Sequence, residues 1–150
     1  MSGVRWLLTA VTLIAAMPPA ALTETVVAEF AIDGDAIAAP LGDRVGDATR
    51  GRAIVLDRRV GNCLICHRVP VPQEPFQGEI GPDLGGIGSH LSVGQLRLRL
   101  VDPARLNAAT VMPPYHRTFG VRRVAPAFAG APVLTAQEVE DVVAWLASLK

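Results

Sequence analysis

The sequence predicts an all-α protein with about three main helices separated by long loops. Residues 92–95 (Ser-Val-Gly-Gln) and 135–138 (Thr-Ala-Gln-Glu) have the spacing of a capping box, and apolar residues follow each at helical intervals. Prolines and glycines are dense between the predicted helices, and strand patterns are weak throughout. Beyond its N-terminal segment the chain is about one domain long, which allows one modest hydrophobic core.

The N-terminal segment, residues 1–22, is predicted to be a secretory signal peptide. One positive charge at Arg5 precedes an apolar run over residues 6–17, and two prolines and several small residues follow. An uncleaved membrane anchor is the alternative, but the apolar run is too short to span a bilayer comfortably. No later stretch of the sequence is long and apolar enough to span a membrane. We therefore expect a protein exported to the periplasm.

Residues 23–46 are predicted to be an irregular extension. They are rich in alanine, glycine and acidic residues, contain Pro40 and show no sustained apolar period. The main domain is predicted over residues 47–150. Its first helix is predicted from residue 48 to about residue 58, with Asp47 as the N-cap. Ala48, Arg52 and Val55 should share one stripe of this helix, with Gly51 and Ile54 beside it.

Two long irregular stretches and two further helices complete the predicted domain. Residues 69–89 contain so many prolines and glycines that no regular element is expected. A loop of this length usually serves a purpose, and enclosing a non-protein group would be such a purpose. A helix then begins after Ser92 and ends at Asp102, before a second irregular stretch that runs to about residue 132. The last helix follows Thr135, with apolar residues at helical spacing at Val139, Val142, Val143, Leu146 and Leu149.

The charge composition excludes one class of partner. The chain has 14 basic and 14 acidic residues, so its formal net charge gives no reason to propose binding to nucleic acid. Lys150 is the only lysine, and all other positive side chains are arginines, which pair well with carboxylates.

The only two cysteines, Cys63 and Cys66, lie directly before His67. A redox dithiol would need this Cys-x-x-Cys between a strand and a helix of a βαβ unit, but the pattern before Cys63 is helical. A structural zinc site would need a fourth ligand, either His90 or His116, and the spacing of these residues is poor for that purpose. Cys-x-x-Cys-His is the attachment sequence of c-type haem, and export agrees with it. We therefore predict one covalent haem c, with thioethers at Cys63 and Cys66 and His67 as the proximal iron ligand.

The second axial ligand is predicted to be Met112. It is the only methionine left after removal of the signal peptide, and Pro113 and Pro114 stiffen the loop behind it. His116 and His90 are the competing candidates, although each is expected to be a half-exposed or second-shell histidine. A methionine ligand would raise the reduction potential and leave no open coordination site.

Three other features resemble small cytochromes c. Residues 81–84 (Gly-Pro-Asp-Leu) resemble the segment in which a proline carbonyl orients the proximal histidine, which here is Pro82. Gly51 and Trp145 resemble the crossing of the first and last helices in that fold. The resemblance implies a cytochrome c-type fold, with long loops enclosing one covalent haem.

Most of the chain from about Gly51 onward is similar to a narrower family, the SoxX cytochrome subunits of thiosulfate-oxidising SoxAX complexes. The similar stretches are GNCLICH, GEIGPDLGGIGS, LRLRLVDPARLNAATVMPPYHRTFGVRRVAPAF and PVLTAQEVEDVVAWLASL. In that family the methionine of the Met-Pro-x-Tyr stretch is the distal ligand, which falls on Met112. His116 departs from the family pattern, where an aromatic residue is expected, and could serve as a back-up ligand. The similarity fades before Asp47.

The resemblance implies a heterodimer in which a larger SoxA-type subunit is catalytic. That partner joins thiosulfate oxidatively to a carrier cysteine, and this subunit passes the electrons to a soluble cytochrome. No catalytic residue is therefore expected in this chain. Residues 120–128, with Arg122 and Arg123, are our hypothesis for part of the docking face. A free periplasmic electron shuttle and a haem protein with an open ligand site are the alternatives.

Overall fold

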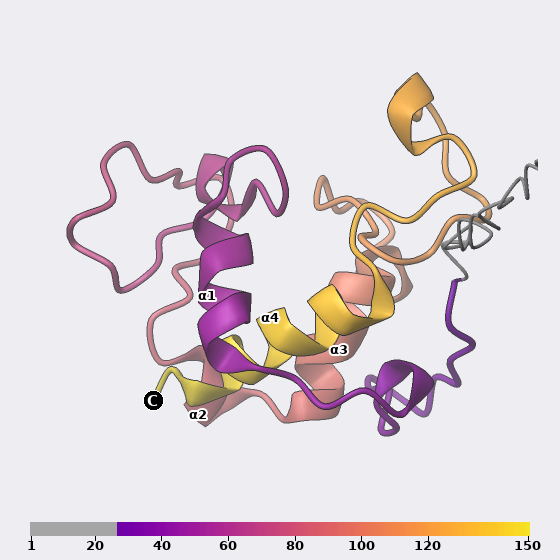
Figure 1. Ribbon diagram of the computed structural model, residues 1–150, viewed down its shortest axis with the longest axis horizontal. Helices are drawn as coiled ribbons and strands as arrows, with labels where there is room; N and C mark the ends of the chain where they lie inside the picture. Colours follow the sequence, from indigo (N-terminus) through magenta and orange to yellow (C-terminus); the bar gives the residue numbers. More distant parts are fainter. Residues whose placement is uncertain (1–26) are drawn as a thin grey trace, which may run out of the picture.

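The computed structural model describes residues 27–150, and among these residues it contains four α-helices and no β-strand. The predicted all-α class is confirmed. The predicted signal peptide and residues 23–26 lie outside the described residues. The helices are α1 (Ala48–Leu56), α2 (Ile87–His90), α3 (Val93–Val101) and α4 (Ala136–Ser148) (Figure 1).

Helix α1 begins where the sequence predicts, because Asp47 caps it. The Asp47 carboxylate accepts hydrogen bonds from the amides of Thr49 (2.8 Å) and Arg50 (3.0 Å). The helix ends at Leu56, two residues before the predicted end, because the chain turns at Asp57. Of the residues predicted to share one stripe, Val55 is buried and Arg52 is exposed, and Gly51 beside them is buried.

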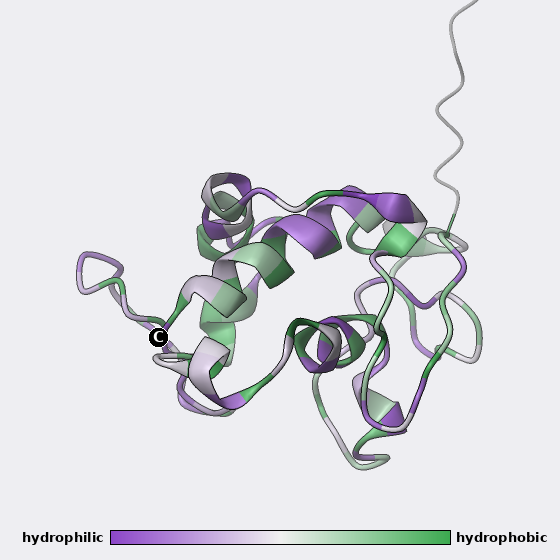
Figure 2. Cartoon of the chain, turned by 90° about the horizontal axis from the view of Figure 1, so that it is seen from below, coloured by the Kyte–Doolittle hydropathy of each residue, from purple (hydrophilic) through white to green (hydrophobic). Residues whose placement is uncertain are grey.

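Helices α3 and α4 begin at capping boxes, as predicted. The Ser92 hydroxyl accepts from the Gln95 amide, and the Gln95 side chain accepts from the Ser92 amide. Thr135 and Glu138 make the same reciprocal pair at the start of α4. In Figure 2 the helices carry both hydrophobic and hydrophilic residues, as expected for elements with one side in the core.

Helix α4 is the centre of the packing and contacts the other three helices. It crosses α1 at Gly51, where a Cβ atom would lie only 1.9 Å from the Asp141 carbonyl oxygen. The predicted role of Gly51 at this crossing agrees with the packing, and Trp145 is buried on the same helix. The buried core combines residues of α4 with residues of α1, α3, the extension and the loops: Ile37, Leu41, Val55, Leu64, Leu98, Val101, Tyr115, Leu134, Val139 and Val143.

The described part of the extension is irregular apart from one 3-10 turn, Leu41–Asp43, but it is packed into the domain. Ile37 and Leu41 are each 1% exposed. A buried ion pair holds this segment, with Arg97 Nε 2.7 Å from Glu140 Oε1. Arg97 also donates to the Ile37 carbonyl (2.5 Å), and the Leu41 amide donates to Glu140 (3.0 Å).

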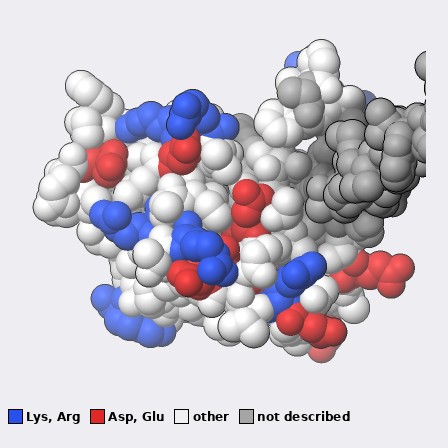
Figure 3. All heavy atoms as spheres, viewed as in Figure 1, with Lys and Arg blue, Asp and Glu red and all other residues white. Residues whose placement is uncertain are grey.

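The prediction of no regular element in residues 69–89 is wrong at its end, because α2 begins at Ile87. Gly86 adopts a left-handed conformation (φ 73°) just before the helix, and Gly88 brings α2 against α4. The remainder of the stretch is a loop. None of the helices in residues 27–150 is both long and apolar enough to cross a membrane. Figure 3 shows basic and acidic side chains interspersed over one face.

Candidate haem site

Cys63, Cys66 and His67 lie on a single helical turn that follows α1. The amides of Cys66 (3.1 Å) and His67 (2.9 Å) both donate to the Cys63 carbonyl. Neither cysteine forms a disulfide. The turn therefore places the two thiols and the imidazole close together.

The electrostatics of Cys63 do not suit a redox dithiol. Burial raises the pKa of the Cys63 thiol to about 11, so the thiol is protonated at neutral pH. Reactive thiols have the opposite property, because a helix N-terminus or a nearby cation lowers their pKa. This thiol is better suited to a permanent thioether than to thiolate chemistry.

A returning segment, residues 78–84, runs beside the turn and fixes its shape. The amides of Gly78, Gly81 and Leu84 donate to the carbonyls of Leu64 (2.8 Å), Cys66 (2.7 Å) and Arg68 (2.9 Å). The proline- and glycine-rich loop thus forms one wall of the site.

His67 is oriented by Pro82 and Gly81 of this segment. Its Nδ1 lies 2.7 Å from the Pro82 carbonyl oxygen, which can only accept, so Nδ1 carries the proton. The imidazole rests on Gly81, where a Cβ atom would lie 2.4 Å from His67 Cε1. With Nδ1 bound to this carbonyl, Nε2 is the ring nitrogen that could bind a metal.

Met112 lies in the loop between α3 and α4. It is partly buried at the edge of the hydrophobic core, and its amide donates to the Thr110 hydroxyl (3.1 Å). Pro113 and Pro114 follow and restrict the backbone. The Met112 side chain therefore lies at the margin of the core and does not fill its centre.

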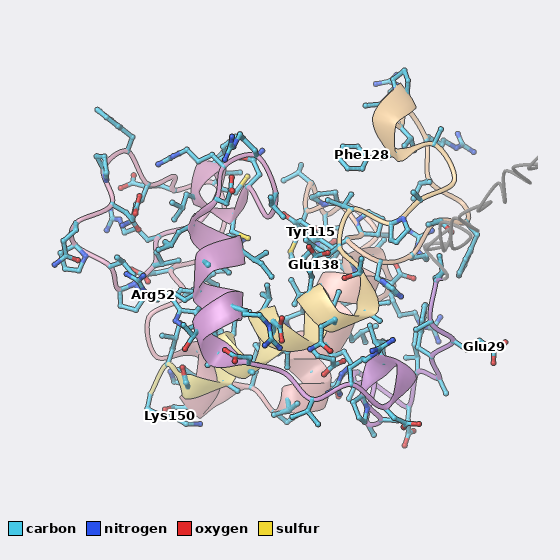
Figure 4. All side chains as sticks on the ribbon, in the orientation of Figure 1. Glu29, Arg52, Tyr115, Phe128, Glu138 and Lys150 are labelled. Carbon is cyan, nitrogen blue, oxygen red and sulfur yellow. The ribbon has the colours of Figure 1, made fainter. Side chains whose placement is uncertain are left out.

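Tyr115, a residue that the sequence analysis did not single out as a site residue, joins three parts of the structure. Its amide donates to Leu100 at the end of α3, and its carbonyl accepts from Leu134 just before α4, both at 2.8 Å. Its hydroxyl donates to the Gly61 carbonyl (2.9 Å), next to the haem-attachment turn. Figure 4 shows Tyr115 between α1 and the loop that leads into α4. The available signal was that the chain's only tyrosine follows the Met112-Pro-Pro stretch directly.

His116 is fully buried (0% exposed), so of the two expected alternatives, a half-exposed or a second-shell histidine, the half-exposed one is wrong for this residue. Its Nδ1 lies 2.9 Å from the Leu134 carbonyl oxygen, and its Nε2 accepts from the Ala28 amide (3.0 Å). Both ring nitrogens are engaged by the backbone, so neither is available as a back-up ligand in this structure. The other candidate, His90, is exposed at the end of α2.

The donor set and its surroundings fit a covalent haem. Cys63 and Cys66 share one turn with His67, the Nδ1 atom of His67 is bound to the Pro82 carbonyl, and the Met112 sulfur lies on a separate loop. Gly81 allows the imidazole to lie directly against the backbone, because a Cβ atom there would clash with the ring. These are the groups that a c-type haem requires: two anchors and two axial donors.

Comparisons with known proteins agree with this fit. The cytochrome c family profile matches residues 48–150. No curated protein sequence matches. The structure is similar to a chain of the crystal structure of SoxXA from P. pantotrophus, with a TM-score of 0.76 and 33% sequence identity. The match covers 81% of this chain and 95% of that chain. The chain therefore belongs to the cytochrome c family, carries a covalent haem c and is a cytochrome of the SoxX type.

Proposed function

We propose that this protein is the periplasmic electron-transfer subunit of a SoxAX-type L-cysteine S-thiosulfotransferase in thiosulfate oxidation. The observation that carries the proposal is the match to a chain of SoxXA over 95% of that chain's length. The arrangement of Cys63, Cys66 and His67 supports it, because these residue types in this order hold the covalent haem of electron carriers.

Four residues are assigned to the haem under this proposal. Cys63 and Cys66 hold it through thioethers, His67 is the proximal ligand through Nε2, and Met112 is the distal ligand. When bound, haem c supplies a one-electron iron couple. The Pro82 carbonyl keeps the His67 ring in one orientation and one tautomer.

The two proposed iron ligands, His67 and Met112, determine the redox and ligand-binding properties of the subunit. The soft sulfur of Met112 favours the ferrous state and raises the reduction potential. With His67 and Met112 both holding the haem iron, the protein itself would supply both iron ligands. Such a subunit exchanges electrons and does not readily bind small ligands.

The partner under this proposal is a larger SoxA-type subunit, which carries out the oxidative transfer of thiosulfate to a carrier cysteine. This subunit receives the released electrons one at a time and delivers them to a soluble cytochrome. Both partners are proteins, in keeping with the balanced formal charge of the chain.

Residues 120–128 are proposed as part of the docking face for the SoxA-type subunit. They form an arm that extends from the helices, coloured orange in Figure 1. Arg122 and Arg123 are exposed on it, and a hollow of about 210 Å³ lies beneath, lined by both arginines and by apolar residues including Phe128. An apolar side chain with a neighbouring carboxylate on the partner would match this surface.

Co-expression with an affinity-tagged SoxA-type subunit tests the proposal. We expect the wild-type cytochrome to co-purify in equal amounts, and the Arg122→Glu, Arg123→Glu variant to dissociate more readily. The Arg52→Glu, Arg59→Glu variant is the matched control, because it makes the same charge change at exposed sites outside the arm. Figure 4 shows Arg52 and Phe128 far apart on the molecule.

Three outcomes have distinct meanings. If the cytochrome is isolated alone and still exchanges electrons with a soluble cytochrome, it is a free shuttle and the proposed subunit role is wrong. If it co-purifies but the two arginine variants behave alike, only the docking face is wrong. Co-purification that the arm variant alone weakens supports both statements.

A further inference from the structure

The loop that carries Met112 makes few hydrogen bonds to the rest of the molecule. Between residues 106 and 114, the hydrogen bonds of the described backbone all have partners within residues 103–112. Beyond Met112, the first residue with hydrogen bonds to other segments is Tyr115. The position of the Met112 sulfur therefore depends on how firmly Tyr115 is held.

We propose that Tyr115 is a positioning residue for the distal ligand: its hydroxyl holds the Met112 loop against the haem-attachment turn and so keeps the Met112 sulfur in place. The inference rests on the proposed role of Met112 as the distal ligand. Tyr115 is three residues from Met112, and its hydroxyl reaches Gly61, two residues before Cys63. One side chain thus connects the two sides of the site through a bond between residues that are 54 positions apart along the chain.

The acceptor of this bond is rigid. Gly61 is buried against α1, and a Cβ atom on it would lie 2.5 Å from the Ile54 carbonyl oxygen. The amide of neighbouring Asn62 donates to the Asp57 carbonyl (3.1 Å). The Tyr115 hydroxyl is therefore attached to a part of the backbone that has little freedom to move.

The hydroxyl has no substitute in the haem-loaded protein. In the described structure the Gly61 carbonyl has one other donor nearby, the Cys63 thiol at 3.5 Å. Once Cys63 is a thioether it has no S–H group to donate, which leaves the Tyr115 hydroxyl as the donor to this buried carbonyl. Loss of that donor would leave a buried acceptor without a partner, a situation that proteins rarely tolerate.

The other two bonds of Tyr115 have a different effect. Its amide and carbonyl bind Leu100 and Leu134 and attach the loop to α3 and α4. These backbone bonds remain in Tyr115→Phe, which removes only the connection to the attachment turn. Burial raises the pKa of the Tyr115 hydroxyl, so it remains a protonated donor at neutral pH.

Titration of the oxidised holoprotein with imidazole tests the inference. Imidazole binds the iron only in molecules whose Met112 loop has moved away, so its apparent affinity reports the fraction of molecules with the loop open. Loss of one hydrogen bond should make the apparent dissociation constant about three- to tenfold smaller in Tyr115→Phe than in wild type. The weak near-red band of methionine-ligated ferric haem should disappear at correspondingly lower imidazole concentration.

Val142→Ala is the matched control, because it destabilises the buried face of α4 without altering a hydrogen bond of the loop. It should lower the thermal stability but leave the imidazole affinity within about twofold of wild type, since folded molecules keep the loop closed. Covalent haem content and far-ultraviolet circular dichroism establish that each variant is folded before titration.

The outcomes separate this inference from the proposed function. A wild-type protein without the near-red band would overturn the assignment of Met112, and this inference with it. A wild-type band combined with equal imidazole affinity in wild type and Tyr115→Phe would overturn the role of Tyr115 alone. A Val142→Ala variant with the same increase in affinity would also overturn it, because the effect would then follow general stability.

Discussion

The two sides of the haem site are held by contacts of different range. On the His67 side, residues 61–84 bind one another, and the bond from His67 to Pro82 spans 15 positions. On the Met112 side, Tyr115 reaches Gly61 across 54 positions, and His116 reaches Ala28 across 88. The proximal side is thus a local structure, whereas the distal side exists only when the whole domain is folded.

This difference has a consequence for the chemistry of the two sides. Under the proposed assignment, covalent bonds at Cys63 and Cys66 anchor the proximal side, and its ligand, His67, is next to them in the chain. The distal ligand depends on tertiary packing, so changes in remote residues affect it. Mutations on the two sides should therefore have different effects, on attachment of the haem in one case and on stability or ligand exchange in the other.

The largest effect is expected from the double substitution Cys63→Ser, Cys66→Ser. Both thioether anchors are lost, so no haem should remain on the polypeptide after denaturing electrophoresis and haem staining. Met112→Ala should retain full covalent haem in the same experiment, because the distal side takes no part in attachment. Covalent haem in the double variant would contradict the assignment of the two anchors.

The next largest effect is expected at the buried ion pair that fixes the extension. Glu140→Leu leaves Arg97 buried without its partner and should lower the free energy of unfolding by about 3–5 kcal/mol in urea denaturation. Arg97→Met combined with Glu140→Leu should lose less, because no charge is then left unpaired. If the single variant is within about 1 kcal/mol of wild type, the extension is not held as described.

A smaller loss is expected for His116→Phe, which restores the aromatic residue that the family resemblance favours. The Ala28 amide and the Leu134 carbonyl lose their partner, so the free energy of unfolding should fall by about 1–3 kcal/mol. His90→Phe at an exposed position is the control and should change stability little. Thermal and urea unfolding of both variants measure the difference, and equal stability would contradict the buried role of His116.

The smallest effect concerns acid stability at Asp141. Burial by itself would raise the pKa of Asp141, but hydrogen bonds from Arg50 (2.7 Å), the Asp47 amide (2.7 Å) and Gln137 (2.9 Å) outweigh it and lower the pKa below its usual value. A lowered pKa means that the ionised carboxylate stabilises the fold above the unfolded-state pKa of about 3.9, and that this contribution disappears as the pH falls through the folded-state pKa.

Urea unfolding of wild type and Asp141→Asn at several pH values from about 6 to about 3 checks this expectation. The stability difference between them should shrink as the pH falls, because the wild-type carboxyl also becomes neutral. Asp43→Asn, at an exposed position, provides the control for loss of one negative charge. A stability difference that stays constant with pH would contradict the lowered pKa.

The local features of the molecule were predictable from sequence, because short patterns determine them. Asp47, Ser92 and Thr135 cap helices at the predicted positions, since an N-cap acts on amides only two or three residues away. The Cys63–His67 turn is likewise encoded in five consecutive residues. The end of α1 was less predictable, because it depends on a turn at Asp57 that no helical pattern indicates.

The long-range features were not predictable in the same way. His116 was expected to be half exposed because histidines commonly are, and its burial depends on Ala28 and Leu134, which no local pattern connects to it. Ile37 and Leu41 lie in an irregular extension without a sustained apolar period, and the segment that carries them is held by Arg97 and Glu140. For Tyr115, the sequence reveals only that it follows Met112 closely. It does not reveal that the Tyr115 hydroxyl reaches Gly61.

The near-red absorbance of the oxidised protein tests the central claim, that this site is completed by Met112, most directly. Wild type should show the weak methionine band, and Met112→Ala should lose it while keeping its covalent haem. His116→Phe and His90→Phe should both retain the band, because neither histidine is the distal ligand. A band that persists unchanged in Met112→Ala would contradict the account.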